Sequence, residues 1–350
     1  MLIFNKYSYW LLFINIIKWR GGINIKKILL LIISCLLLVG CSKTSSKDII
    51  KKYKNKIEKE SYYTMSGQMD IVSNEEMYNY EINVLYLKPD YYKVSLINKQ
   101  SNNEQIILKN NSGTFVVTPS LNKSFKFQSD WPYNSSQVYI LSSLLKDLEN
   151  DDNVLYEETN DKYILTSTVN YPNNINLLSQ RITFNKDFLP EKASVYDKDG
   201  NECITLKISK IDFENKLNEK DFSIDNIPVT NETEVSKSID EIMYPMYLPV
   251  GTKFKSEETI KGEETERVIL TFSGDKSFIL IEELSLVPDE LEVTATSGEL
   301  VFYENILGSL NESSLNWSMN GKDYYLIGNN MTNDELLKVA SSIGVVAITK

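Results

Sequence analysis

The side chains that could do chemistry in this chain are mainly carboxylates, because its 350 residues include no histidine. This absence excludes Ser-His-Asp and Cys-His nucleophile systems, histidine-ligated zinc and the usual general base near neutral pH. Paired carboxylates remain, since two of them can hydrolyse a glycosidic bond. Adjacent acids occur at Asp151-Asp152, Glu157-Glu158, Glu263-Glu264 and Glu282-Glu283.

The spacing of these acids argues against a catalytic dyad. Successive side chains of a strand point to opposite faces of a sheet, so adjacent acids are held apart. The chain has no glycine-rich phosphate loop and no calcium-loop pattern. The segment 197–201 (Asp-Lys-Asp-Gly-Asn) predicts a hairpin turn in which Gly200 supplies a positive φ. We therefore predict a protein that is not an enzyme, without catalytic residues or a metal site.

The three cysteines predict no disulfide in the mature protein. Cys203 lies in a run that alternates apolar and polar residues, which is typical of an inert strand cysteine. Cys35 lies in an eleven-residue apolar segment, residues 28–38, behind Lys26 and Lys27. Positive charge, a short apolar segment and small residues follow one another as in a secretory signal peptide. Eleven residues are too few to cross a bilayer, which takes about 20.

The segment Leu38-Val39-Gly40-Cys41 at the end of this signal resembles the lipobox of bacterial lipoproteins. The resemblance implies cleavage before Cys41 and a covalent diacylglyceryl lipid, with acyl chains such as palmitate, on its thiol. No other cofactor is expected. The alternative is an ordinary signal peptide with an incidental cysteine. Residues before Lys26 fit such a signal poorly. Residues 19–22 can be encoded by a purine-rich run that resembles a ribosome-binding site, so translation is expected to start near Ile23 or Ile25.

Removal of residues 1–40 takes away five basic residues and no acid, leaving 32 basic against 48 acidic residues, a net charge of −16. So acidic a chain is not expected to bind nucleic acid. The length after cleavage suffices for two domains. We expect a polar tether at 41–47, a domain at 48–226, a linker at 227–241 and a smaller α+β domain at 242–350. The tether reaches at most about 20 Å at roughly 3.5 Å per residue.

Hydrophobic periodicity in residues 48–226 predicts an antiparallel meander interrupted once by a helix. An initial helix is expected over 48–60, and the second helix over 134–148, with Asn134 as N-cap and Gln137 as its partner. Strands are expected at 62–71, 77–87, 91–97, 104–109, 114–118, 123–127, 154–158, 163–169, 180–184, 192–196 and 204–211. So much sheet is buried best as one strongly curved antiparallel sheet with helices on its concave face.

The last domain carries fewer signals. Strands are expected near 267–272, 277–282, 291–295 and 324–327. A final helix begins at a capping box, Thr332 to Glu335, and presents apolar residues on one face.

Two segments resemble a known family: Trp131-Pro132 followed by the Asn134–Gln137 helix start, and the hairpin at 196–200 within the long meander. They are similar to LolA-like lipoproteins of spore-forming bacteria, of the sporulation lipoprotein YdcC and germination lipoprotein GerS types. The C-terminal part, with residues 248–251 and 321–328, resembles a domain of unknown function appended to them. The resemblance implies a mainly β fold, an incomplete β-barrel with a helical lid around a hydrophobic hollow.

Two functions compete for this hollow. In one, apolar residues line or cover a cavity for a lipid or lipoprotein; the candidates are Trp131, Tyr139, Leu141, Leu144, Leu145 and Leu148. In the other, the same residues are ordinary core. The protein then acts as a binding or scaffold module that docks an envelope or cortex-modifying protein during sporulation or germination. We favour the second. A purely structural surface lipoprotein is a third alternative.

The expected location is the extracytoplasmic face of the cell membrane, including the space between forespore and mother-cell membranes. A lipid on Cys41 would keep the folded part within about 20 Å of that membrane, so a freely diffusing carrier is excluded. The sequence does not identify the partner, the ligand or the oligomeric state.

Overall fold

A computed structural model describes residues 44–73, 76–133, 135–229, 238–262 and 265–345 of the chain. The part from Ser46 onward forms one compact unit. The predicted signal peptide and Cys41 lie outside the described residues. Within these ranges, none of the helices has the length and apolar character needed to cross a membrane.

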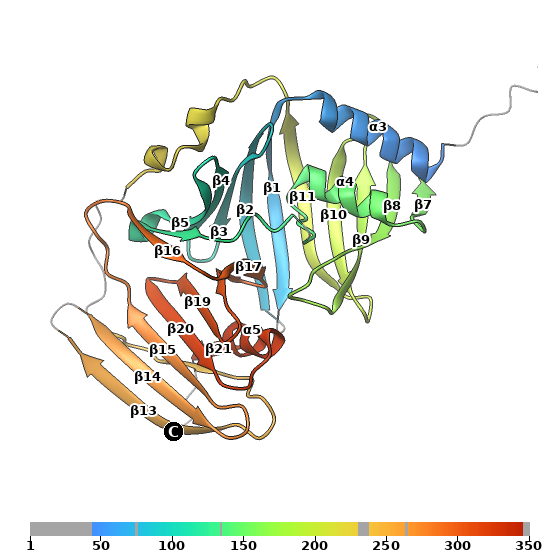
Figure 1. Cartoon of the computed structure of the whole chain (residues 1–350). Coiled ribbons are helices and arrows are strands. Elements are labelled where there is room, and N and C mark those ends of the chain that lie inside the picture. The colour runs from blue at the N-terminus through green and yellow to red at the C-terminus, as the bar shows by residue number, and fades with distance from the viewer. Residues whose placement is uncertain (1–43, 74–75, 134, 230–237, 263–264, 346–350) are drawn as a thin grey trace, which may run out of the picture. The chain divides into compact units, whose positions relative to one another are not determined.

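A 12-stranded sheet dominates the fold, with the strand order β16-β6-β5-β4-β3-β2-β1-β11-β10-β9-β8-β7 (Figure 1). It curves strongly, and β16 and β7 remain as its two edges rather than closing a barrel. All neighbours are antiparallel except β16 and β6. The predicted mainly β fold with an incomplete barrel is confirmed. The strands are β1 (Tyr62–Ser73), β2 (Glu76–Leu87), β3 (Tyr91–Asn98), β4 (Glu104–Asn110), β5 (Gly113–Thr118), β6 (Lys123–Phe127), β7 (Leu155–Glu158), β8 (Tyr163–Thr168), β9 (Leu177–Phe184), β10 (Pro190–Asp197), β11 (Glu202–Asp212) and β16 (Glu292–Thr296).

The eleven strands predicted for the first domain are all present, and in several of them, such as β1 and β8, buried side chains alternate with more exposed ones. In β1, Tyr63, Met65, Met69 and Ile71 are buried on one face. A bulge between Ser66 and Gly67 shifts the register with β11. A Cβ atom at residue 67 would lie 2.4 Å from the carbonyl oxygen of Lys207, so only glycine allows this close approach. The predicted turn after β10 also forms, with Gly200 at φ 83°.

Two helices, α3 (Ser46–Lys59) and α4 (Leu141–Asn150), lie against one face of this sheet (Figure 1). α3 begins inside the predicted tether, so Ser46 and Lys47 belong to the helix. It buries Ile49, Tyr53 and Ile57, one apolar residue per turn. The hydroxyl of Tyr53 donates a hydrogen bond of 2.8 Å to the carbonyl oxygen of Leu141, which joins α3 to the first turn of α4.

The predicted start of the second helix is wrong. α4 begins at Leu141, its N-cap position is Ile140, and no side chain caps it. Gln137 is not a capping partner; its backbone N–H donates to Ser143 Oγ at 2.8 Å. Asn134 lies outside the described residues. The reason is that residues 136–140 are all buried, whereas an amphipathic helix at the surface exposes one side of every turn.

The C-terminal region forms a 7-stranded antiparallel sheet with the order β13-β14-β15-β20-β19-β18-β17. Helix α5 (Asn333–Ser341) packs on it, and the predicted capping box between Thr332 and Glu335 is confirmed. A short pair, β12 (Met243–Pro245) and β21 (Ile343–Val345), lies beside them. The strands are β13 (Lys253–Lys261), β14 (Glu266–Ser273), β15 (Phe278–Leu284), β17 (Glu299–Tyr303), β18 (Ile306–Leu310), β19 (Ser314–Met319) and β20 (Lys322–Gly328).

The predicted linker at 227–241 lies partly outside the described residues, which resume at Ser238. Its two described ends are held by the sheets. Ile227 is buried in a small cluster with Phe222 on the outer face of the first sheet. At the other end, the N–H of Ile239 donates to Glu266 and that of Met243 to Glu282, at 2.6 and 2.9 Å.

Strand β17 is shared by two hydrophobic cores. Its side chains alternate, so Leu300 and Phe302 pack into the core of the first sheet, whereas Val301 and Tyr303 belong to the core under α5. One strand of the C-terminal region therefore forms part of the wall of the hollow that the first sheet encloses.

Candidate binding pocket

All six candidate residues lie in one core cluster, between the helices and the concave face of the first sheet. Their exposed fractions range from 0 to 5%. The four leucines lie on α4, as the predicted amphipathic spacing requires, while Trp131 and Tyr139 lie in the irregular segment before it.

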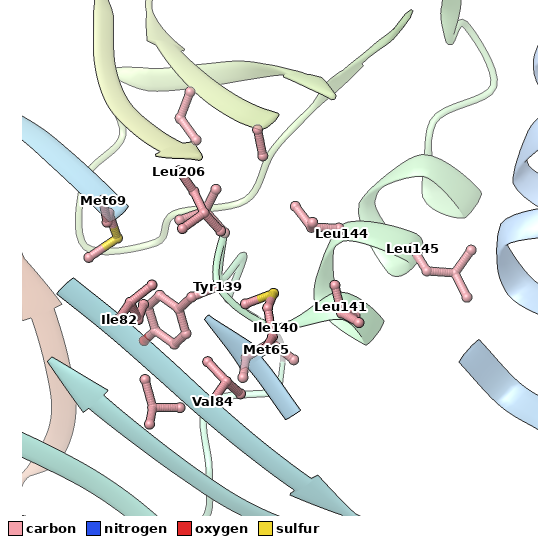
Figure 2. Packing of buried hydrophobic residues seen from close by; sticks show 14 of the residues in the cluster. Met65, Met69, Ile82, Val84, Tyr139, Ile140, Leu141, Leu144, Leu145 and Leu206 are labelled. Carbon is pink, nitrogen blue, oxygen red and sulfur yellow. The ribbon is translucent and has the colours of Figure 1, made fainter. Parts of the chain in front are cut away.

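The leucines fill the hollow. Figure 2 shows the side chains of Leu141 and Leu144 among residues of the sheet and of the segment before α4, including Met65, Ile140 and Leu206. Leu141 and Leu144 are 0 and 1% exposed. Such packing is typical of a core at native density. Leu148 lines a pocket beside α3, whereas Leu141, Leu144 and Leu145 line neither that pocket nor the one that contains Trp131.

Trp131 and Tyr139 have a different environment, because both line a pocket of about 520 Å³. The pocket lies between the first sheet, which contributes Met69 and Ile71, and β17, which contributes Phe302. Its size is within the range of small-molecule sites. We call it the Trp131 pocket.

An aromatic row fixes the position of Trp131. Its indole stacks on the ring of Tyr92, with centroids 5.0 Å apart and planes at 19°. Tyr92 in turn contacts Tyr86, and Tyr86 contacts Tyr63, each with centroids 5.0 Å apart. Offset pairs of this kind add about 0.5–1.5 kcal/mol each beyond the area that they bury. One ring face of Trp131 is therefore occupied by protein.

Two pocket residues, Phe302 and Glu304, were not among the predicted site residues. The ring of Phe302 lies 6.2 Å from that of Tyr139 and 6.4 Å from that of Tyr80. Glu304 follows β17 at φ 55°, a left-handed conformation that is uncommon for a residue other than glycine, and its carboxylate accepts a hydrogen bond from Ser73 Oγ. Nothing in the local sequence of residues 299–304 predicts that they contact the hollow enclosed by residues 62–211.

A polar network anchors α4 beside the pocket. Ser136 Oγ donates to Asp147 Oδ1 at 2.9 Å, and Gln180 Nε2 donates to Asp147 Oδ2 at 3.2 Å. The N–H of Asn170 donates to Ser136 Oγ at 2.8 Å. Burial raises the pKa of the Asp147 carboxyl to about 6, and the hydrogen bonds from Ser136 and Gln180 offset this rise only in part.

This raised pKa makes stability depend on pH. The folded state holds the Asp147 proton more tightly than the unfolded chain does, so the free energy of unfolding falls as the pH rises from the ordinary aspartate pKa of 3.8 to about 6. We expect Asp147→Asn to raise the free energy of unfolding by about 2 kcal/mol at pH 8 and to change it little at about pH 3, where the carboxyl is protonated in both states. Urea denaturation at both pH values measures this. Asp152→Asn, at an exposed position nearby, serves as the control, and an equal gain at both pH values would contradict the assignment.

The adjacent acids identified in the sequence have separate structural partners. Glu157 pairs with Arg181 at 2.8 Å and Glu158 with Lys186 at 3.1 Å. Glu282 pairs with Lys322, whereas Glu283 pairs with Arg267. Asp151 accepts the N–H of Thr168 at 2.7 Å. Glu263-Glu264 lies outside the described residues.

Comparison with known proteins gives one relative that spans most of the chain. Over 318 residues, the chain is 34% identical to sporulation protein YdcC of Bacillus subtilis (strain 168), covering 89% of this chain and 94% of that protein. No protein-family model matches the chain.

Solved structures give weaker similarities. The GerS lipoprotein–CwlD amidase complex of Clostridioides difficile aligns with 20% identity and a TM-score of 0.25, covering 50% of this chain and 98% of the other. A domain described as outer membrane lipoprotein-sorting, from Vibrio parahaemolyticus, aligns with 15% identity and a TM-score of 0.28, covering 51% and 98%. The assignment rests on the sequence relative: the chain belongs to the family of sporulation protein YdcC.

Proposed function

We propose that this protein is a non-enzymatic binding or scaffold module, anchored through a lipid on Cys41 to the outer face of a membrane in a sporulating cell. The main observation in support is that side chains fill the space between α4 and the concave face of the first sheet. The α4 leucines are buried in the core under the concave face of the first sheet, in space that a lipid carrier would keep open. The sporulation context comes from the name of the relative, and the anchor from the lipobox resemblance.

The acids support a non-catalytic role. A catalytic dyad needs two carboxyl groups that share a site, about 5–10 Å apart for glycoside hydrolysis. Glu157, Glu158, Glu282 and Glu283 instead each pair with a different lysine or arginine, and Asp151 accepts a backbone N–H. These contacts serve strand pairing and loop anchoring.

The alternative is a tethered protein that binds a lipid or a lipoprotein. The observation in its favour is the Trp131 pocket, whose volume of about 520 Å³ admits an acyl chain. Its occupant therefore decides between the two functions.

Native mass spectrometry of the chain from Ser42 onward separates the two functions. We expect a lipid-free protein, and intact mass of full-length protein extracted from membranes should show a diacylglyceryl thioether on Cys41. In sporulating host cells, a defined envelope protein should co-purify with the anchored chain. It should be absent when an unrelated domain carries the same anchor. Co-purified lipid in the Ser42 chain would instead support the lipid-binding alternative.

A further inference from the structure

The Trp131 pocket combines aromatic side chains with carboxylates. Six rings contribute to its lining: Trp131, Tyr133, Tyr139, Tyr171, Phe302 and Tyr303. Asp130, Glu299 and Glu304 also line it, and none of the lysines and arginines in the described part of the chain does. An acyl-chain site is expected to be apolar, with a cation where it must hold a carboxylate head group. The charge of this lining has the opposite sign.

The three carboxylates have no ion-pair partner among the residues that the structure describes. Glu304 accepts a hydrogen bond from Ser73, which orients its carboxylate but brings no positive charge. The pocket therefore has a negative potential, which is focused by its apolar walls.

Aromatic faces and carboxylates both attract organic cations. A lysine ammonium or an arginine guanidinium over an aromatic face gains about 0.5–2 kcal/mol, and a charge-assisted hydrogen bond to a carboxylate adds to this. A pocket of about 520 Å³ is larger than one such side chain, so it has room for apolar neighbours against Met69, Ile71 and Leu300. The acidic chain as a whole attracts a basic segment from a distance.

We propose that the Trp131 pocket binds a lysine or arginine side chain, flanked by apolar residues, of an extended segment of a partner protein. This inference rests on the docking role proposed above and names the chemistry that the partner must present. Glu304 and Phe302 bring the C-terminal region into the site, so the pocket is complete only when both sheets are present.

Matched peptides test the charge preference on the chain from Ser42 onward, which contains the whole compact unit. Acetyl-Leu-Lys-Leu-amide is compared with the same peptide carrying norleucine, which has no amine, or glutamate; octanoate represents an anionic acyl chain. Of the two tryptophans that remain, Trp131 and Trp317, only Trp131 lines the pocket, so tryptophan fluorescence reports binding. We expect the lysine peptide to bind about tenfold more tightly than the norleucine peptide, and the glutamate peptide and octanoate to bind most weakly.

Variants assign this preference to the pocket. Glu304→Gln should reduce the affinity for the lysine peptide to that for the norleucine peptide, whereas Glu312→Gln, at an exposed acid that does not line the pocket, should change neither. The exposed Glu299→Gln replaces Glu304→Gln if that variant does not fold. Equal affinities for lysine and norleucine, or tighter binding of octanoate, would overturn the proposal. Equal affinities in a lipid-free protein would leave the docking role standing, whereas co-purified lipid would overturn that role.

Discussion

Replacing Leu144 by alanine should lower the free energy of unfolding by about 3–5 kcal/mol. The side chain is 1% exposed and lies in the core formed by α3, α4 and the concave face of the first sheet. Truncation leaves a cavity, because the surrounding sheet cannot collapse around the missing atoms, and the cavity adds to the lost transfer free energy. Equilibrium denaturation in urea measures the change.

The size of this effect also tests whether the hollow is filled. Leu155 is 66% exposed on β7, so Leu155→Ala should change stability by no more than about 0.5 kcal/mol. If Leu144 lined an open cavity instead, its truncation would only enlarge that cavity. A loss below about 1 kcal/mol, similar to that of the control, would contradict the filled core on which the docking role rests.

Replacing Glu282 by glutamine should cost about 3 kcal/mol of stability, since it leaves the mostly buried ammonium group of Lys322 without its counter-charge. The side chains of Glu282 and Lys322 are 1 and 17% exposed, and they form an ion pair between neighbouring strands β15 and β20. Glutamine keeps an oxygen that can accept the N–H of Met243, so the substitution removes mainly the charge. Thermal unfolding at low and high salt reports the loss, which should depend little on salt because the pair is buried.

The adjacent residue provides the matched control. Glu283 is on the other face of β15 and pairs with Arg267, whose side chain is 44% exposed. Exposed pairs contribute about 0–1 kcal/mol, so Glu283→Gln should have a small, salt-dependent effect. Equal losses for the two variants would show that burial does not govern the contribution of Glu282.

The strands of the first sheet could be predicted because short stretches of sequence specify them. Residues such as Tyr63, Met65 and Met69 alternate with polar neighbours, and turn residues separate the strands. The same reasoning misplaced the start of α4, because Val138 lies three residues before Leu141 and so fits a helical spacing, although it belongs to a buried irregular segment. Tertiary burial, which the local pattern does not contain, decided between the two.

The C-terminal strands were predicted less completely, for two opposite reasons. β13 escaped detection because all nine of its residues are exposed, which leaves no apolar alternation. β18 is buried at all five positions, and a continuously buried strand has no period of two either. β16 was expected as a strand, but its pairing with β6 depends on a contact between distant segments.

Only some of the residues that line the candidate pocket were expected from the sequence. Trp131 and Tyr139, which were expected to line or cover the hollow together with the leucines of the predicted helix, both line the pocket. The leucines of that helix pack as core, as ordinary helical spacing most often indicates. Phe302 and Glu304 could not be found, since only the folded chain brings β17 to the hollow.

The parallel pairing of β16 with β6 has a consequence for biosynthesis. Translation delivers β6 long before β16, so the nascent first sheet has an open flank, which is a template for aberrant intermolecular pairing. The growing polypeptide acquires its protecting strand only after residue 296 has been added. A product terminated before Glu292 would therefore lack β16, which covers the edge strand β6. Such a product would depend on chaperones or proteolysis to avoid aggregation.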